Sequence, residues 1–271
     1  MESPRKLQLS TREVPRLLWR DSAGSTNTEL VALAADPSLP AFTALATSDQ
    51  TAGRGRLDRS WVAPAGTALA VSVLVRAPGT TNGLGWLPLA AGAAMFDAVS
   101  SVLPPGTTVG IKWPNDVQVD GRKVCGILAE IVPSAAASGV AVVIGAGLNL
   151  TMTAEQLPVP TATSLLLEGA DAADPDALTD RVLSRYLHEL TGLVTGLGNG
   201  NGDADLSGLR AAVVERCTTI GREVRVELPG GEQRHGTAVG IDEFGRLEVR
   251  DDAGRVTAVA AGDIIHLRSS R

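Results

Sequence analysis

The chain has 271 residues, a length that accommodates one large domain with a smaller one attached. Its formal net charge of −6 argues against a general nucleic-acid-binding protein, and its longest apolar runs are too short to span a bilayer. The two cysteines are far apart and no apolar segment follows the N-terminus, which favours a protein of the reducing cytoplasm.

The first third of the chain predicts three short strands and one helix. Leu17–Arg20 and Phe42–Ser48 have the apolar character of strands, and Thr67–Val75 predicts another. Between the first two, Thr26 and Glu29 stand three residues apart before an Ala/Leu-rich run, which is the spacing of a capping box at a helix start. The second and third strands enclose a segment rich in glycine and arginine.

That segment, Gln50–Trp61, carries three permanent positive charges at Arg54, Arg56 and Arg59. Glycine allows backbone N–H groups to approach a ligand closely, and the planar donor fork of arginine suits carboxylate and phosphate. The segment therefore predicts a flexible loop that binds an anion and closes over it. A solvated basic surface loop is the alternative.

The middle of the chain predicts a helix over Leu84–Val102 and then three strands, Val109–Trp113, Val117–Val119 and Lys123–Ile131. Asp120-Gly121 lies between the last two strands and is a strong two-residue hairpin signal. A tight hairpin would place Lys123 across from Asp116, so that the two charges can share one site.

The first of these strands ends in Lys112-Trp113-Pro114-Asn115-Asp116. The Trp-Pro pair favours an extended or turn geometry, and Trp113 would present an aromatic face between a cation and an anion. The alternative is an ordinary strand exit with a buried tryptophan.

The C-terminal half predicts a buried strand over Val140–Leu150 and helices over Pro175–Leu193 and Leu206–Cys217. A solvated, mobile glycine-rich loop is expected at Gly196–Asp205. From Thr219 onward, short β-rich runs alternate with turns, as in a small barrel of about 50 residues. No P-loop motif occurs and all three histidines lie in this half, so the chemistry is expected to use Arg, Lys, Asp and backbone donors.

Five motifs, in order and at similar spacing over about residues 17–150, resemble those of the biotin protein ligases: Ser25-Thr26-Asn27, Gln50 with Gly53-Arg54-Gly55-Arg56 and Arg59-Ser60-Trp61, Lys112–Asp116, Arg122-Lys123 with Gly126-Ile127-Leu128, and Gly145–Asn149. The resemblance implies an α+β fold over residues 1–218, a mixed β-sheet flanked by helices as in class II synthetases. It also implies an SH3-like β-barrel over residues 219–271.

The resemblance further implies a two-step reaction. Biotin's carboxylate would attack the α-phosphate of ATP, accompanied by Mg²⁺, to give biotinyl-5′-AMP and pyrophosphate. A lysine of a biotin carboxyl carrier protein domain would then take up the biotinyl group and release AMP.

Site residues follow from the same resemblance. Catalysis is assigned to Lys123, Arg54, Asp116 and Lys112. Biotin binding is assigned to Ser25, Thr26, Asn27, Gln50, Gly53, Arg54, Trp61, Gly126 and Leu128, and phosphate or nucleotide binding to Arg56, Arg59, Lys123 and Asn149. Mg²⁺ would arrive with the ATP phosphates, and no protein ligand for it is identified. Asp58 stands where the family commonly has a small residue, and its effect on the loop is open.

Two other functions are open. A lipoate or octanoate–protein ligase has a related fold, but it would not be expected to combine the glycine–arginine and Lys-Trp-Pro-Asn-Asp motifs. A biotin-binding sensor without transfer activity is the second alternative. About sixteen residues precede the first predicted strand, too few for a helix-turn-helix domain, so we expect a monofunctional protein with no nucleic-acid or membrane partner. A monomer and a weak homodimer are both compatible with the sequence.

Overall fold

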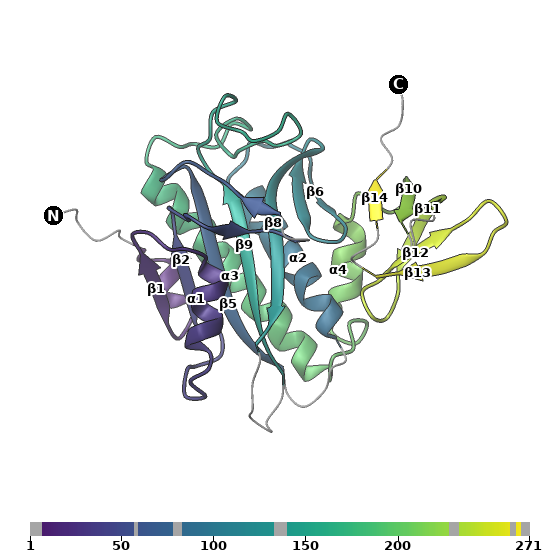
Figure 1. Ribbon diagram of the computed structural model, residues 1–271, viewed down its shortest axis with the longest axis horizontal. Coiled ribbons are helices and arrows are strands. Elements are labelled where there is room, and N and C mark those ends of the chain that lie inside the picture. The colour runs from purple at the N-terminus through teal and green to yellow at the C-terminus, as the bar shows by residue number, and fades with distance from the viewer. Residues whose placement is uncertain are drawn as a thin grey trace.

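The computed structural model describes residues 7–56, 59–77, 83–132, 140–227, 233–260 and 264–266, and its centre is a seven-stranded mixed sheet (Figure 1). The strand order is β1-β2-β5-β9-β8-β7-β6. The bounds are β1 Leu17–Arg20, β2 Ala44–Thr47, β5 Ala68–Ala77, β6 Val109–Lys112, β7 Asp116–Val119, β8 Arg122–Ile131 and β9 Val140–Asn149. Only the β1–β2 pairing in this sheet is parallel. The predicted strands and the mixed sheet are confirmed.

Helices cover both faces of this sheet (Figure 1). Their bounds are η1 Ser10–Arg12, α1 Thr26–Leu33, η2 Leu84–Trp86, α2 Leu87–Ser100, α3 Pro175–Asn199 and α4 Leu209–Arg216. The larger core lies on the α2 and α3 side, whereas a smaller core around Leu30 of α1 lies on the other side. None of the helices in the described part of the chain is long and apolar enough to cross a bilayer.

Strand β9 has apolar side chains on its α1 face in its first half and glycines on that face in its second half. Side chains alternate between the two faces of a strand, so every second residue of β9 faces α1. On that face Ala141 and Val143 pack into the smaller core, but the next two positions are Gly145 and Gly147. The sheet is therefore bare beside the N-terminus of α1.

The segment from Glu223 onward forms a second, five-stranded antiparallel sheet. Its strands are β10 Glu223–Glu227, β11 Gln233–Ile241, β12 Leu247–Arg250, β13 Val256–Val259 and β14 Ile264–His266, in the order β13-β12-β11-β10-β14. The β11–β12 turn docks on the first sheet's domain. Trp86 Nε1 donates to Glu243 O at 2.8 Å, and Trp113 Nε1 donates to Gly245 O at 3.1 Å.

We expect Trp113→Phe to lower the free energy of unfolding by about 1–3 kcal/mol, because the Gly245 carbonyl loses its donor in buried surroundings while most of the aromatic volume remains. Urea unfolding followed by circular dichroism measures this change. Leu206→Ala, at a position 80% exposed, is the control and should stay within about 0.5 kcal/mol of the parent. Equal stability of Trp113→Phe and the parent would contradict the docking role.

The start of α1 differs from the predicted capping box. Ser25, rather than Thr26, is the N-cap, and its Oγ accepts from Thr28 N at 3.5 Å. Glu29 accepts instead from Gly24 N at 3.1 Å. Ser25 has the extended backbone that an N-cap requires, whereas Thr26 is already helical. The Thr26 side chain is thereby available to the site.

The prediction of a mobile loop over Gly196–Asp205 was partly wrong. Helix α3 continues through Asn199, and α4 begins at Leu209 rather than at Leu206. Burial of Leu197 on α3 outweighs the low helix propensity of the neighbouring glycines. Asp58, the most uncertain residue of the arginine segment, lies outside the described residues.

Candidate active site

A short ribbon lies over the bare end of β9. Its strands, β3 Gly53–Arg54 and β4 Ser60–Trp61, pair antiparallel within the segment that was predicted to be a loop. A Cβ at Gly147 would stand 2.6 Å from Trp61 Cε2, and one at Gly126 would stand 3.3 Å from Trp61 Cζ3. The glycines on β8 and β9 therefore allow the indole of Trp61 to lie directly against the sheet.

Lys123 and Asp116 meet beside this indole. The predicted hairpin is confirmed, with positive φ at both Asp120 (47°) and Gly121 (77°). Lys123 Nζ lies 2.6 Å from Asp116 Oδ1 and 5.8 Å from the centroid of the Trp61 ring. The predicted proximity of Lys123 and Asp116 is confirmed, and the aromatic ring beside them is that of Trp61.

A chain of polar side chains lines the N-terminus of α1. Thr26 N donates to Gln50 Oε1 at 2.9 Å, which leaves the Gln50 amide nitrogen beside Gly53. Ser72 Oγ lies 2.8 Å from Thr26 Oγ1 and 2.6 Å from Asn27 Oδ1. The sequence analysis missed Ser72, although a serine within an otherwise apolar strand requires buried hydrogen-bond partners and is a usable signal.

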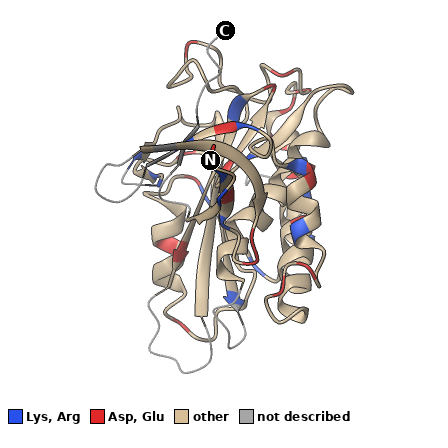
Figure 2. Ribbon diagram, turned by 90° about the vertical axis from the view of Figure 1, so that its right-hand side faces the viewer, with Lys and Arg blue, Asp and Glu red and all other residues tan. Residues whose placement is uncertain are grey.

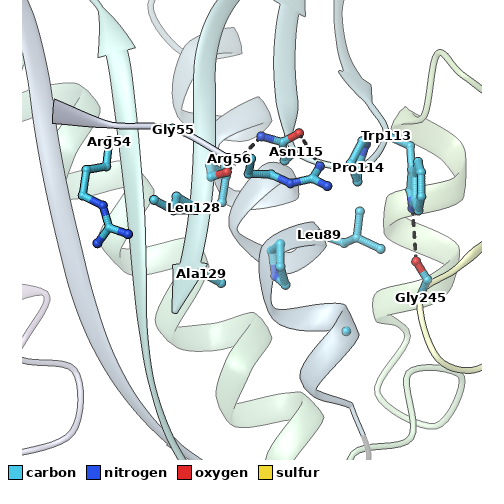
Figure 3. A pocket seen from close by; sticks show the side chains of 13 residues that line it. Arg54, Gly55, Arg56, Leu89, Trp113, Pro114, Asn115, Leu128, Ala129 and Gly245 are labelled. Atoms are coloured by element: carbon cyan, nitrogen blue, oxygen red, sulfur yellow. Dashed lines mark hydrogen bonds between the residues drawn. The ribbon is translucent and has the colours of Figure 1, made fainter. Parts of the chain in front are cut away.

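The first two arginines of the segment point in different directions (Figure 3). Arg54 Nη1 pairs with Glu130 Oε1 at 2.9 Å, whereas Arg56 Nη1 donates to Asn115 Oδ1 at 3.0 Å. Arg59 is exposed, and its carbonyl accepts from Gly55 N. Glu130 was also missed, although it is the one acidic residue in the predicted strand Lys123–Ile131. Arg54 and Arg56 therefore make contacts with different parts of the sheet's domain.

Arg56 borders a pocket of about 360 Å³ between β8, the start of α2 and the β11–β12 turn, lined also by Leu89, Asn115, Leu128 and Gly245 (Figure 3). Burial lowers the pKa of the Arg56 guanidinium from its ordinary value, while the charge of Asp116 opposes that shift. The prediction that Trp113 presents an aromatic face was wrong, and the alternative of a buried tryptophan holds. This residue is only 1% exposed, and its indole N–H donates to Gly245 O.

The remaining predicted residues lie around this centre. Asn149 is buried, and its Nδ2 donates to Thr163 O at 2.8 Å. The backbone of Lys123 pairs with that of Thr161 and Thr163, so the segment after β9 runs beside β8. Lys112 stands opposite Asp116 in the β6–β7 ladder.

Basic and acidic positions are interspersed over the molecule (Figure 2), and the cations of the site follow this pattern. Besides the Lys123–Asp116 and Arg54–Glu130 pairs, Arg122 Nη2 lies 2.7 Å from Glu168 Oε1. An anionic ligand would therefore exchange one ionic partner for another at Lys123 and Arg54. Burial raises the pKa of the Cys125 thiol, which keeps it neutral beneath the site.

Two family models match the chain. The Biotin/lipoate A/B protein ligase family model matches residues 22–149, which carry the site described above. The Biotin protein ligase C terminal domain model matches residues 219–267, which include the second sheet.

Curated relatives cover most of the chain. A biotin--[acetyl-CoA-carboxylase] ligase of Mycobacterium tuberculosis is 43% identical over 92% of this chain and 90% of its own length. An enzyme of the same name from Paracoccus denitrificans is 34% identical over 88% of this chain and 95% of its own length. Among solved structures, a biotin protein ligase from Aquifex aeolicus in complex with biotin and ATP has a TM-score of 0.70 and 26% identity, covering 94% of this chain and 100% of that one.

Proposed function

The chain belongs to the biotin protein ligase family, and on that premise we propose that it is an ATP-dependent, AMP-forming biotin–[biotin carboxyl carrier protein] ligase. The observation that carries the proposal is the Lys123–Asp116 pair against the Trp61 ring, beside a segment that bears three arginines. This arrangement offers an apolar surface on which the biotin ring can pack. It also offers cations that can bind the biotin carboxylate and the ATP phosphates. A lipoate or octanoate ligase and a silent biotin sensor are not favoured.

In the first step, a carboxylate oxygen of biotin attacks the α-phosphorus of ATP. The bond from this phosphorus to the bridging oxygen of the β-phosphate breaks, and pyrophosphate leaves with the electron pair. Two unit charges about 4 Å apart repel by about 4 kcal/mol at an effective dielectric near 20. Lys123 is proposed to offset this repulsion and to stabilise charge that develops on the α-phosphate, and its position beside the Trp61 ring supports this role.

Arg56 and Arg59 are the proposed contacts for the phosphates, and Asn149 for the nucleotide. Mg²⁺ in nucleotide sites is held by phosphates together with one or two carboxylates. In the described part of the chain no three acidic, histidine or cysteine side chains lie together, and Asp116 is paired with Lys123, so the ion would be held chiefly by the ATP phosphates. When bound, the ion would reduce the negative charge that the biotin carboxylate meets.

In the second step, a lysine amine of the carrier attacks the biotinyl carbonyl, the bond from this carbon to the phosphate oxygen breaks, and AMP leaves. The amine must lose a proton as the amide forms. Asp116 is the proposed acceptor, with Lys112 across the ladder as a neighbouring cation. No covalent enzyme intermediate is needed.

Biotin is proposed to lie with its ring and tail against the apolar wall that Trp61, Gly126 and Leu128 form. Its ureido group would meet the Gln50 amide, Thr26 and the backbone at Gly53. Ser25 and Asn27 shape this end of the pocket from the start of α1. We also propose that residues 1–218 form the catalytic domain, that residues 219–271 form the C-terminal domain, and that the enzyme acts in the cytoplasm.

The proposed function is tested by ATP–pyrophosphate exchange and by transfer of labelled biotin to a purified carrier domain. Exchange that depends on biotin, and incorporation at one carrier lysine, are the expected results. Exchange stimulated only by lipoate would replace the assignment with a lipoate ligase. Tight biotin binding without AMP formation would indicate a sensor.

We expect Arg54→Ala to release more adenylate into solution, by about threefold or more per carrier labelled, because the segment loses one charged contact to the sheet. Chromatography of free biotinyl-AMP and labelled carrier in single-turnover reactions measures this partition. Arg210→Ala removes a cation from a surface pair with Asp205 and should leave the partition unchanged. An unchanged partition in Arg54→Ala would count against a closing segment.

A further inference from the structure

Glu130 of β8 lies between the β3–β4 ribbon and helix α1. Its Oε1 accepts from Arg54 of the ribbon at 2.9 Å, and its Oε2 accepts from Asn27 Nδ2 of α1 at 2.8 Å. We propose that Glu130 is a positioning residue with two roles. Through Arg54 it holds the arginine segment, and through Asn27 it sets which atoms donate and which accept in the hydrogen bonds that link the Asn27, Ser72 and Thr26 side chains. The functional part of this inference rests on the proposed function.

Glu130 fixes the orientation of the Asn27 amide. An ionised carboxylate and a main-chain carbonyl only accept hydrogen bonds. Asn27 faces Glu130 Oε2 and also Leu128 O, at 3.1 Å, and both contacts are made by Nδ2. Both amide protons are therefore committed on that side, and Oδ1 must face Ser72 as an acceptor.

The number of hydroxyl protons then sets which side chain donates and which accepts in the remaining hydrogen bonds. Ser72 and Thr26 carry one hydroxyl proton each, yet three oxygen–oxygen contacts compete for them. These are Ser72 to Asn27 Oδ1 at 2.6 Å, Ser72 to Thr26 at 2.8 Å and Thr26 to Gln50 Oε1 at 3.2 Å. Because Ser72 donates to Asn27, its 2.8 Å contact with Thr26 is a hydrogen bond only if Thr26 donates. The shorter contact then takes the Thr26 proton, and the 3.2 Å contact to Gln50 is left without a hydroxyl proton.

In this order the Thr26 proton is committed to Ser72, and a lone pair of Thr26 Oγ1 can accept from a donor on a ligand. The Gln50 oxygen is satisfied by Thr26 N, so its amide nitrogen remains the donor near Gly53. Without Glu130, Asn27 loses one of the two acceptors that hold its orientation, and the opposite proton order becomes accessible. The Glu130 carboxylate thus determines which donors and acceptors the site offers to a ligand, without contacting that ligand itself.

Two substitutions separate the two contacts of Glu130. In Glu130→Gln the side chain keeps one acceptor oxygen and gains a donor. Leu128 O continues to require the Asn27 donor, so the glutamine oxygen faces Asn27 and its NH₂ faces Arg54, where two donors repel. Glu130→Ala removes both contacts.

Helix α3 offers a matched control. Arg185 and Glu189 form a pair at 2.8 Å with side-chain exposures of 50% and 23%, and the Arg54–Glu130 pair has 2.9 Å with 51% and 23%. Glu189→Gln therefore removes an equivalent charge outside the site.

The experiment compares these variants in three measurements: the rate of tryptic cleavage after Arg54, the release of adenylate, and KM and kcat for biotin in ATP–pyrophosphate exchange. For Glu130→Gln we expect cleavage and release to rise about threefold or more with KM within about twofold. For Glu130→Ala we expect, in addition, a rise of about tenfold in KM for biotin with kcat within about threefold. Glu189→Gln should match the parent throughout.

Parental KM, release and cleavage in a folded Glu130→Ala variant would overturn the inference, as would equal effects in Glu189→Gln. If Glu130→Ala does not unfold cooperatively, the double variant Arg54→Ala/Glu130→Gln decides. If the increases in adenylate release caused by the two single changes add fully in the double variant, the coupling between Arg54 and Glu130 is overturned. Adenylate release no greater than in Arg54→Ala alone supports the coupling. If the parent protein shows no biotin-dependent exchange, the proposed function fails, whereas tryptic cleavage still reports on the Arg54–Glu130 contact.

Discussion

Lys123→Ala is expected to lower biotin-dependent ATP–pyrophosphate exchange by about 10³-fold, equivalent to about 4 kcal/mol of transition-state stabilisation. Lys123 pairs with Asp116 and lies over the Trp61 ring, and under the proposed function it acts where the biotin carboxylate and the α-phosphate approach each other. The substitution also leaves the Asp116 carboxylate, which is 21% exposed, without its ionic partner. Repulsion between that carboxylate and the substrates would add to the loss.

The exchange rate at saturating ATP and biotin measures this effect, and circular dichroism verifies the fold. Arg210→Ala is the control for loss of a cation, because the Arg210 side chain is 30% exposed and that of Lys123 is 34% exposed. It should change the rate by less than about twofold. A parental exchange rate in folded Lys123→Ala would remove Lys123 from the mechanism.

The second large effect is expected at Gly145. A Cβ at this position would overlap Asn27 Oδ1 and stand 2.8 Å from Asn27 Cγ. Asn27 cannot move aside cheaply, because Leu128, Glu130 and Ser72 all hold its amide. Gly145→Ala should therefore raise the dissociation constant for biotin about tenfold or more and lower the free energy of unfolding by about 1–3 kcal/mol.

Calorimetric titration with biotin and urea unfolding measure the two parts of this prediction. Gly192→Ala on α3 is the matched control, because a Cβ there meets no atom within 4 Å. It should leave biotin binding unchanged and increase stability by up to about 1 kcal/mol, since alanine is the better helix former. Biotin affinity in Gly145→Ala equal to that of the parent would show that the start of α1 is not held as described.

Local sequence patterns predict much of the fold because they report on short-range physics. The Asp120-Gly121 turn is an example, because positive φ at two adjacent residues is a local requirement that this pair meets. The capping of α1 shows the limit of such patterns. Ser25 and Thr26 are both good N-caps, and the choice between them depends on where the chain entering the helix becomes extended.

The arginine segment shows a different limit. Its charge and glycine content predict an anion-binding role, but its pairing into β3 and β4 depends on Trp61 finding room over Gly126 and Gly147. These glycines come from strands more than sixty residues further along the chain. No pattern within the segment contains that information.

The sequence by itself determined the order of most helices and strands, the family and the residue types proposed for the chemistry, since periodicity, turn residues and motif spacing are properties of the chain. The tertiary structure decided which of these residues meet. It paired Arg54 with Glu130 and Arg56 with Asn115, buried Trp113 against the C-terminal sheet, and made Ser72 the centre of a hydrogen-bonded chain. Such contacts depend on the facing of strands and on the hydrogen-bond partners that burial requires, and both are set only when distant segments pack together.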